Sequence, residues 1–290
     1  MKAAAIDLGT NAFRCLIRNI DSNYDTDIKI RYFVGLGKFL DKNNKLNLPA
    51  KYYSALDNIF NVISQNCVKK IHIVGTSVFR DSLNKNEILL DFKNRYKQEL
   101  NIIDPETEAQ LTSLGVNTLF TNPDSDKIIV DIGGGSTEII FMSQQQIVYF
   151  YSLDLGVIKL YKEFKEINSF SKEKTKQIKD FVKKVIQVSN ISLNNIKNYQ
   201  IVFNSGTSTT LAAISKNLKN YDSSIINKVS LSITETYEIL NILASKTAKQ
   251  RLLINGIEKG REEVIVYGII ILTTLMAVSY THLTLPTSLG

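Results

Sequence analysis

The sequence predicts an α/β protein made of two related lobes around a central cleft. An apolar strand followed by Asp, one apolar residue and Gly occurs in "AAAIDLGTNAFR" and again in "IIVDIGGGSTEI", and the two aspartates, Asp7 and Asp131, are 124 positions apart. In both halves, strand patterns are followed by helical patterns, which is typical of α/β proteins. With 290 residues and 44% hydrophobic residues, the chain is long enough for two domains with separate cores.

The first half begins with three strand patterns, at residues 2–8, 12–20 and 27–37, separated by turn signals. A helix is expected next within residues 47–67, where one face carries Tyr53, Leu56, Phe60 and Ile63. A strand at 69–77 and helices at 87–98 and 107–119 complete the lobe. In the strand, His72 alternates with apolar neighbours, which predicts a core histidine.

The loop "TNPDSDK" marks the lobe boundary, so the lobes are expected at residues 1–122 and 123–277. The second lobe should contain strands within 127–142 and 145–156, Lys-rich helices from about 172 to 187, and a strand with a Gly-Thr turn at 199–214. The apolar run 264–276 is shorter than the roughly 20 residues of a membrane span. It predicts a buried core helix, and no membrane partner is expected.

The glycine-rich turn after Asp131 is the first candidate for a binding site. Gly133, Gly134 and Gly135 leave their amide groups unshielded, an arrangement that can cradle phosphate oxygens, and Ser136 and Thr137 can add hydroxyl donors. An ordinary glycine-rich hairpin turn is the alternative. The same strand–Asp–x–Gly pattern also occurs at Asp7, and this repetition favours phosphate binding.

Composition narrows the partners only slightly. The net charge of +7 and the pI of about 9.1 favour a polyanionic partner, although the charges are dispersed. Basic and aromatic residues do not interleave as in a nucleic-acid-binding fold, so no nucleic acid is expected. Cys15 and Cys67 lack CxxC spacing, which indicates reduced, buried thiols in a cytoplasmic protein.

Seven segments, in order, resemble the exopolyphosphatase/guanosine pentaphosphate phosphohydrolase (Ppx/GppA) family. They are "AAIDLGTNAFR", "VGTSVFRDSLN", "EAQLTSLGV", "DIGGGSTEI", "SLDLGVIKL", "SGTSTTLAA" and "GREEVIVYGIIIL". The resemblance runs from Lys2 to about Ala277 and implies the short form of the family. It implies two ribonuclease-H-like lobes of the actin-like ATPase superfamily, and a homodimer as one assembly.

The resemblance also implies hydrolysis of the terminal phosphate of inorganic polyphosphate or guanosine pentaphosphate, with Mg²⁺ as cofactor. Glu108 matches the catalytic acid that activates water, and Glu138 matches a second carboxylate. Asp7 and Asp131 are the expected metal ligands. The expected phosphate-binding residues are Thr10, Asn11, Arg14, Arg80, Gly133, Gly134, Gly135, Ser136, Thr137, Gly206 and Thr207.

The sequence departs from the family pattern beside the catalytic acid. Asp104 and Pro105 stand where a Ser-Gly pair is usual, and Gln110 replaces a basic residue. These departures keep open a second function, a catalytically weak sensor of polyphosphate or alarmone. The wider superfamily leaves a third, an ATP-dependent small-molecule kinase.

The end of the chain differs from the family as well. Residues 278–290, "VSYTHLTLPTSLG", resemble translated sequencing-adapter DNA, and the family's following strand is not matched. We therefore expect a non-native tail and an incomplete second lobe.

Overall fold

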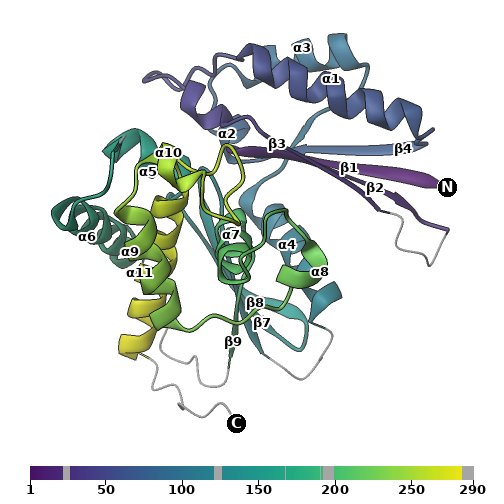
Figure 1. Cartoon of the computed structure of the whole chain (residues 1–290). Helices are drawn as coiled ribbons and strands as arrows, with labels where there is room; N and C mark the ends of the chain where they lie inside the picture. Colours follow the sequence, from purple (N-terminus) through teal and green to yellow (C-terminus); the bar gives the residue numbers. More distant parts are fainter. Residues whose placement is uncertain (22–26, 121–125, 167, 190, 192–198, 283–290) are drawn as a thin grey trace. The chain divides into compact units, whose positions relative to one another are not determined.

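The computed structural model describes residues 1–21, 27–120, 126–166, 168–189, 191 and 199–282, with the backbone alone for 278–282. It is a mixed α/β fold, as predicted (Figure 1). The chain divides into two compact units, the first covering Met1–Glu108 and the second beginning at Ala109. This division lies inside the helix Pro105–Leu119, so it is N-terminal to the predicted boundary after residue 122. The reason is that the later turns of this helix pack on the second sheet.

The first unit contains a five-stranded sheet in the order β3-β2-β1-β4-β5. β1, β2 and β3 are antiparallel, whereas β4 and β5 run parallel to β1, which is the ribonuclease-H-like arrangement. The strands are β1 Lys2–Leu8, β2 Ala12–Asn19, β3 Ile28–Phe33, β4 Lys70–Gly75 and β5 Asn101–Ile102. The helices are the 3-10 helix η1 Leu36–Phe39, α1 Ala50–Gln65, α2 Ser77–Arg80, α3 Lys85–Tyr96 and α4 Pro105–Leu119.

Helices α1 and α3 cover one face of this sheet (Figure 1). Alternate residues of the strands, such as Ile6, Cys15 and Ile73, are buried against helix residues such as Ile59 and Phe92. The period-2 alternation of the strands therefore has a direct cause, since the described helices of this unit that pack on the sheet lie against one of its faces.

The second unit repeats the first four strand positions in the order β8-β7-β6-β9. β6, β7 and β8 are antiparallel and β9 is parallel to β6. The strands are β6 Lys127–Ile132, β7 Thr137–Ser143, β8 Gln146–Leu153 and β9 Gln200–Phe203. The helices are α5 Val157–Phe164, α6 Lys172–Val188, α7 Gly206–Ser215, α8 Ser223–Ile226, α9 Ile233–Ala244, α10 Ala248–Arg251 and α11 Ile265–His282.

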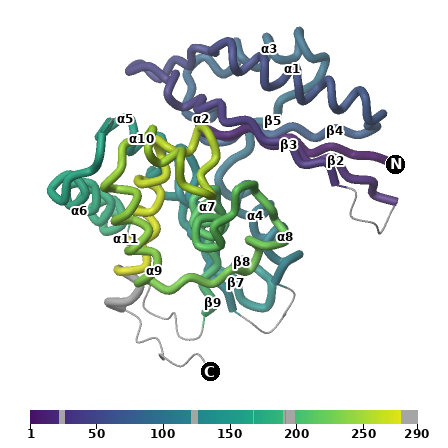
Figure 2. The backbone as a smooth tube through the Cα atoms, in the orientation of Figure 1, coloured from purple at the N-terminus to yellow at the C-terminus, as the bar shows by residue number. Residues whose placement is uncertain are grey.

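Both faces of the second sheet are packed. Ile129, Ile140 and Met142 lie against Ala109 and Val116 of α4. The opposite face packs against the apolar helix α11, which lies beside α6 and α9 (Figure 2). α11 is therefore a core helix as predicted, and none of the described helices is long and apolar enough to cross a membrane.

Several details differ from the sequence prediction. The buried face of α1 includes Tyr52 and Ile59, with Tyr53 and Phe60 only partly buried beside it. His72 is exposed, so the prediction of a core histidine is wrong, because it points to the sheet face opposite α1 and α3. Cys15 is buried as expected, whereas Cys67 is exposed. α11 extends through residue 282, and residues 283–290 of the expected non-native tail lie outside the described residues.

Candidate active site

The two sequence repeats form equivalent hairpins, one in each unit. Gly9 donates its amide to the Ala12 carbonyl at 3.1 Å, and Gly133 donates to the Ser136 carbonyl at 2.9 Å. A Cβ atom on either glycine would lie 2.9 Å from that carbonyl oxygen, closer than normal packing allows. The glycine in each Asp-x-Gly pattern is therefore required by the tight turn that joins the first two strands of its unit.

The first hairpin pairs a carboxylate with a cation. Asp7 and Arg14 lie directly opposite each other on β1 and β2, and the Arg14 Nη1 atom donates to Asp7 Oδ2 at 2.8 Å. The predicted metal ligand and the predicted phosphate clamp are thus neighbours, and both side chains are partly exposed.

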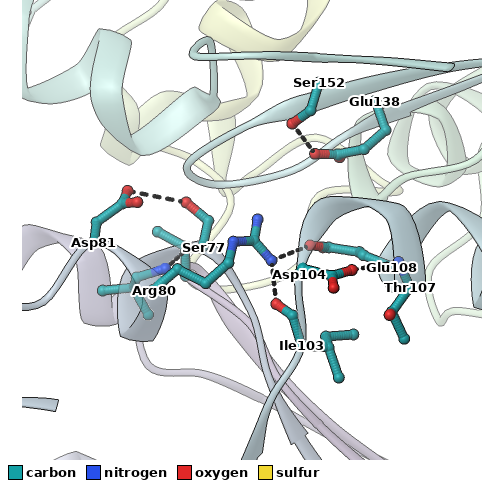
Figure 3. Close-up of polar contacts among 11 residues, drawn as sticks. Ser77, Arg80, Asp81, Ile103, Asp104, Thr107, Glu108, Glu138 and Ser152 are labelled. Atoms are coloured by element: carbon teal, nitrogen blue, oxygen red, sulfur yellow. Dashed lines mark hydrogen bonds and ion pairs between the residues drawn. The ribbon is translucent and has the colours of Figure 1, made fainter.

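The second hairpin pairs two carboxylates at the same positions. Asp131 lies opposite Glu138, and opposed side chains on adjacent strands are about 5 Å apart at Cβ. The Asn204 side-chain amide donates to Asp131 at 2.9 Å. The Ser152 hydroxyl donates to Glu138 at 3.0 Å (Figure 3). Glu138 is only 3% exposed. Two facing carboxylates with neutral donors nearby form a place that favours a cation.

The glycine-rich loop of the second hairpin directs its carbonyls toward helix α5. The amides of Val157 and Ile158, at the first turn of α5, donate to the Gly133 and Gly134 carbonyls at 3.1 and 2.9 Å. Within the described part of the chain, the amides of Gly134 and Gly135 have no backbone acceptor. The loop therefore keeps these two donors for another group, as expected of a phosphate-binding turn.

The corresponding turn of the first unit, Thr10 and Asn11, is more enclosed. Both residues are less than a tenth exposed, and their carbonyls accept from the amides of Gly37 and Gly35. The Thr10 hydroxyl accepts from the Val78 amide at 3.2 Å, at the start of α2. This bond leaves the hydroxyl hydrogen of Thr10 able to donate to a phosphate.

Arg80 and Glu108 form a directed ion pair within the first unit. The Arg80 Nη1 atom donates to Glu108 Oε2 at 2.7 Å and to the Ile103 carbonyl at 2.9 Å (Figure 3). Burial raises the pKa of the Glu108 carboxyl. The hydrogen bond and charge of Arg80 lower this pKa, and the charge of Asp7 raises it. The net pKa is raised, which suits a carboxylate that accepts a proton from water.

The departures before Glu108 have a clear structural role. The Asp104 carboxylate accepts from the Thr107 amide at 2.7 Å, which is the bond of a helix N-cap, and Pro105 is the first residue of α4. That amide bond holds the pKa of Asp104 below its usual range. Asp104 and Pro105 thus begin the helix that carries Glu108 in its first turn.

Two predicted phosphate ligands have other contacts. The Thr137 side chain is fully buried and its hydroxyl donates to the Leu155 carbonyl at 2.6 Å. Thr207 is 2% exposed and packs against Gly268 of α11, while its amide donates to the N-cap residue Ser205. In the described conformation the Thr137 hydroxyl hydrogen and the Thr207 amide hydrogen are thus used in bonds within the second unit.

Gly206 adjoins a cation that the sequence reasoning did not assign. A Cβ atom on Gly206 would lie 1.6 Å from Nη2 of Arg261, so the guanidinium lies directly against the start of α7. Arg261 is 5% exposed. It belongs to the segment "GREEVIVYG", which the family resemblance includes, and a basic residue in that segment was the available signal.

The donor set fits a hard divalent cation in the second unit. Among the residues that the structure describes, no group of three or more His, Cys, Asp or Glu side chains is arranged to hold a metal ion. Mg²⁺, however, keeps several waters and commonly uses one or two carboxylates together with substrate phosphates. The facing pair of Asp131 and Glu138 meets this requirement, whereas Asp7 is paired with Arg14.

Fold and site together define an α/β protein whose paired Asp-x-Gly hairpins are suited to phosphate groups. The chain belongs to the Ppx/GppA phosphatase family, whose model matches residues 28–283.

Individual relatives agree with this assignment. The bifunctional 3-dehydroquinate synthase/phosphatase of Fusobacterium nucleatum is 29% identical, over 94% of this chain and 43% of the relative, so the chain spans less than half of that protein. Exopolyphosphatase 2 of Mycobacterium tuberculosis is 25% identical over 94% of this chain and 89% of the relative. The crystal structure of an exopolyphosphatase from Cytophaga hutchinsonii has the same fold, with a TM-score of 0.82, 23% identity, and coverage of 96% and 91%.

Proposed function

We propose that this protein hydrolyses the terminal phosphoanhydride bond of inorganic polyphosphate or guanosine pentaphosphate, using a water molecule as nucleophile. The observation that carries the proposal is the Arg80–Glu108 pair, in which a largely buried carboxylate with a raised pKa is held by a cation. The family match and relatives named exopolyphosphatase support the reaction class.

Glu108 acts as the base in this proposal. Burial raises the pKa of the Glu108 carboxyl, which makes it a better acceptor for the proton of the attacking water than an exposed carboxylate. Arg80 is a positioning residue: it also donates to the Ile103 carbonyl, which fixes its guanidinium and thereby the orientation of Glu108. Phosphoryl transfer depends chiefly on such positioning and on charge stabilisation.

The glycine-rich turn binds the phosphate that is removed. The amides of Gly134 and Gly135 donate to its oxygens, with Ser136 as a further donor of the same unit. Thr10 and Asn11 are the candidate phosphate donors of the first unit. Neutral amide donors stabilise charge that develops on the phosphoryl oxygens without an added counterion. Arg14 and the start of α7 at Gly206 supply additional positive potential.

We propose that Asp131 and Glu138 would hold a divalent cation, Mg²⁺, and Asp7 is the candidate carboxylate ligand of the first unit. When bound, the cation neutralises phosphate charge. The protein's own contribution is the fixed separation of two carboxylates on adjacent strands, each held by a neutral donor, Asn204 or Ser152.

The test measures phosphate release from long-chain polyphosphate and from guanosine pentaphosphate, with Mg²⁺ and with chelator. Glu108→Gln keeps the size of the side chain and removes the base, so release should fall by at least about a hundredfold, the lower range for general-base catalysis. Unchanged release in Glu108→Gln would refute the assignment. Tight binding of either ligand without metal-dependent release would instead support the sensor function.

A further inference from the structure

The segment between α10 and α11 forms a loop that packs along α7. A Cβ atom on Gly256 would lie 2.5 Å from the backbone nitrogen of Ile214, in the last turn of α7. At the other end of the same helix, the Nη2 atom of Arg261 lies against Gly206, the first residue of α7. We call residues 252–261 the strap, because they follow α7 from its last turn to its first residue (Figure 1).

A single side chain joins the two ends of the strap. Arg251 immediately precedes the strap, and its Nη1 atom donates at 3.0 Å to the carbonyl of Glu262, which immediately follows it. The Nε atom of Arg251 donates to the Leu243 carbonyl at 2.8 Å, so the same guanidinium fixes the strap to the end of α9. A loop of this length whose ends are held together is an Ω-loop, a type of loop that frequently carries function.

The burial of Arg251 is costly. The residue is 0% exposed, its Cζ atom lies 5.1 Å from the centre of the Phe170 ring, and its Nη2 atom has no hydrogen-bond partner within the described residues. Burial lowers the pKa of the guanidinium to about 10, against the opposing influence of Tyr267 and Glu166, so the group is charged at neutral pH. Both of its hydrogen bonds go to carbonyl groups. Since apolar side chains often serve stability as well as a buried charge does, the guanidinium points to a role besides stability.

The strap brings a cation to the edge of the second sheet where phosphate is expected. β6 and β9 are adjacent parallel strands, so the glycine-rich turn after β6 and the start of α7 after β9 lie at the same edge. The hydrogen bond from Asn204 to Asp131, at 2.9 Å, joins the ends of these two strands. Arg261, at the start of α7, therefore lies on the same edge as the glycine-rich turn.

We propose that Arg251 is a positioning residue for phosphate binding, because by holding the Glu262 carbonyl it fixes the adjacent Arg261 at the start of α7. The inference rests on the proposed function, in which the start of α7 supplies positive potential to the substrate phosphates. A guanidinium beside a helix N-terminus is repelled by the positive end of the helix dipole. It therefore needs a structural constraint to stay there, and the closed ends of the strap supply one.

The experiment measures the Kd of tripolyphosphate in the full chain carrying Glu108→Gln, which prevents turnover. Arg251→Met keeps a long side chain but removes the charge and both hydrogen bonds. We expect it to raise Kd roughly five- to tenfold, because the Arg261 guanidinium is displaced rather than lost. Arg261→Gln should raise Kd about ten- to a hundredfold, as for one charge-assisted hydrogen bond, and adding Arg251→Met to it should then have no further effect. The control Lys249→Met removes an exposed charge from the same short helix and should leave Kd unchanged.

A merely structural role predicts a different result. Arg251→Met would then unfold at a lower urea concentration while its Kd stays within about twofold of the parent, or its effect on Kd would persist undiminished beside Arg261→Gln. Either outcome overturns the proposal. If Arg251→Met does not fold, Phe170→Leu removes the ring that lies against the guanidinium and keeps an apolar side chain. Phe170→Leu should also raise Kd and should lose that effect beside Arg261→Gln.

Activity measurements separate this proposal from the proposed function. In the chain with Glu108 intact, Arg251→Met should raise KM and leave the acidic limb of the profile of kcat/KM against pH in place, because Glu108 is held by Arg80 in the first unit. Absence of phosphate release by the wild type, with the pattern of Kd values retained, would overturn only the enzymatic function. Absence of tripolyphosphate binding by the parent protein would overturn the positioning role.

Discussion

The contact between Gly156 and the glycine-rich loop offers a sharp test of how the phosphate-binding turn is held. A Cβ atom at Gly156 would lie 2.4 Å from the Gly134 carbonyl oxygen and 2.6 Å from the carbonyl carbon of Gly135. These are backbone atoms and cannot rotate away. Gly156→Ala must therefore separate α5 from the loop and weaken the two amide bonds from Val157 and Ile158.

The expected cost follows from these contacts. Two backbone hydrogen bonds contribute about 0.5–1.5 kcal/mol each, and forced backbone shifts cost about 1–3 kcal/mol. We expect Gly156→Ala to lower the free energy of unfolding by about 2–6 kcal/mol, which corresponds to a fall in Tm of roughly 4–24 °C. KM for substrate should also rise, because the loop amides move.

Gly115→Ala is the matched control. Gly115 lies within α4, and nothing lies within 4 Å of a Cβ placed there, so the change should stabilise the helix by about 0.5–1 kcal/mol. Thermal and urea unfolding, followed by circular dichroism, compare both variants with the wild type. A Gly156→Ala protein that melts within one or two degrees of the wild type would show that α5 and the loop are not held by this contact.

Three further predictions concern single side chains. Arg80→Gln removes a charge-assisted hydrogen bond of about 1.5–3 kcal/mol. The pKa of Glu108 should therefore rise further, and the acidic limb of the profile of kcat/KM against pH should move to higher pH. The control Arg95→Gln breaks a surface ion pair with Asp57 and should leave that limb in place. Asp104→Ala removes the cap of α4 and lowers Tm at neutral pH. Because the folded pKa of Asp104 is depressed, the difference from the wild type should shrink as pH falls through that pKa, and a constant difference in acid would contradict the capping role. Thr137→Val leaves the Leu155 carbonyl without its donor and should cost about 1–3 kcal/mol in urea unfolding, with kcat unchanged. A large loss of kcat in a stable protein would instead support the prediction that Thr137 binds phosphate.

Much of the fold could be predicted from the sequence because its determinants are local. The alternation in "KAAAIDL" and "AFRCLIRNI" reflects a sheet with one packed face, and the apolar run of α11 reflects burial on all sides. Short helices such as α2, with four residues, carry too little periodicity to be recognised. The prediction for His72 failed because alternation shows that the two faces of a strand differ but does not show whether the second face is buried.

The candidate site divides in the same way. The sequence by itself determined the two Asp-x-Gly turns, the position of Glu108 at the start of a helix, and the family. Each of these features depends on short, continuous stretches of residues. Only the tertiary structure decided that Arg80 holds Glu108, that Arg261 lies against Gly206, and that Asp131 faces a carboxylate where Asp7 faces Arg14. These relations join residues far apart in the chain, and strand register and helix packing set them through the burial of apolar faces rather than through the polar residues themselves.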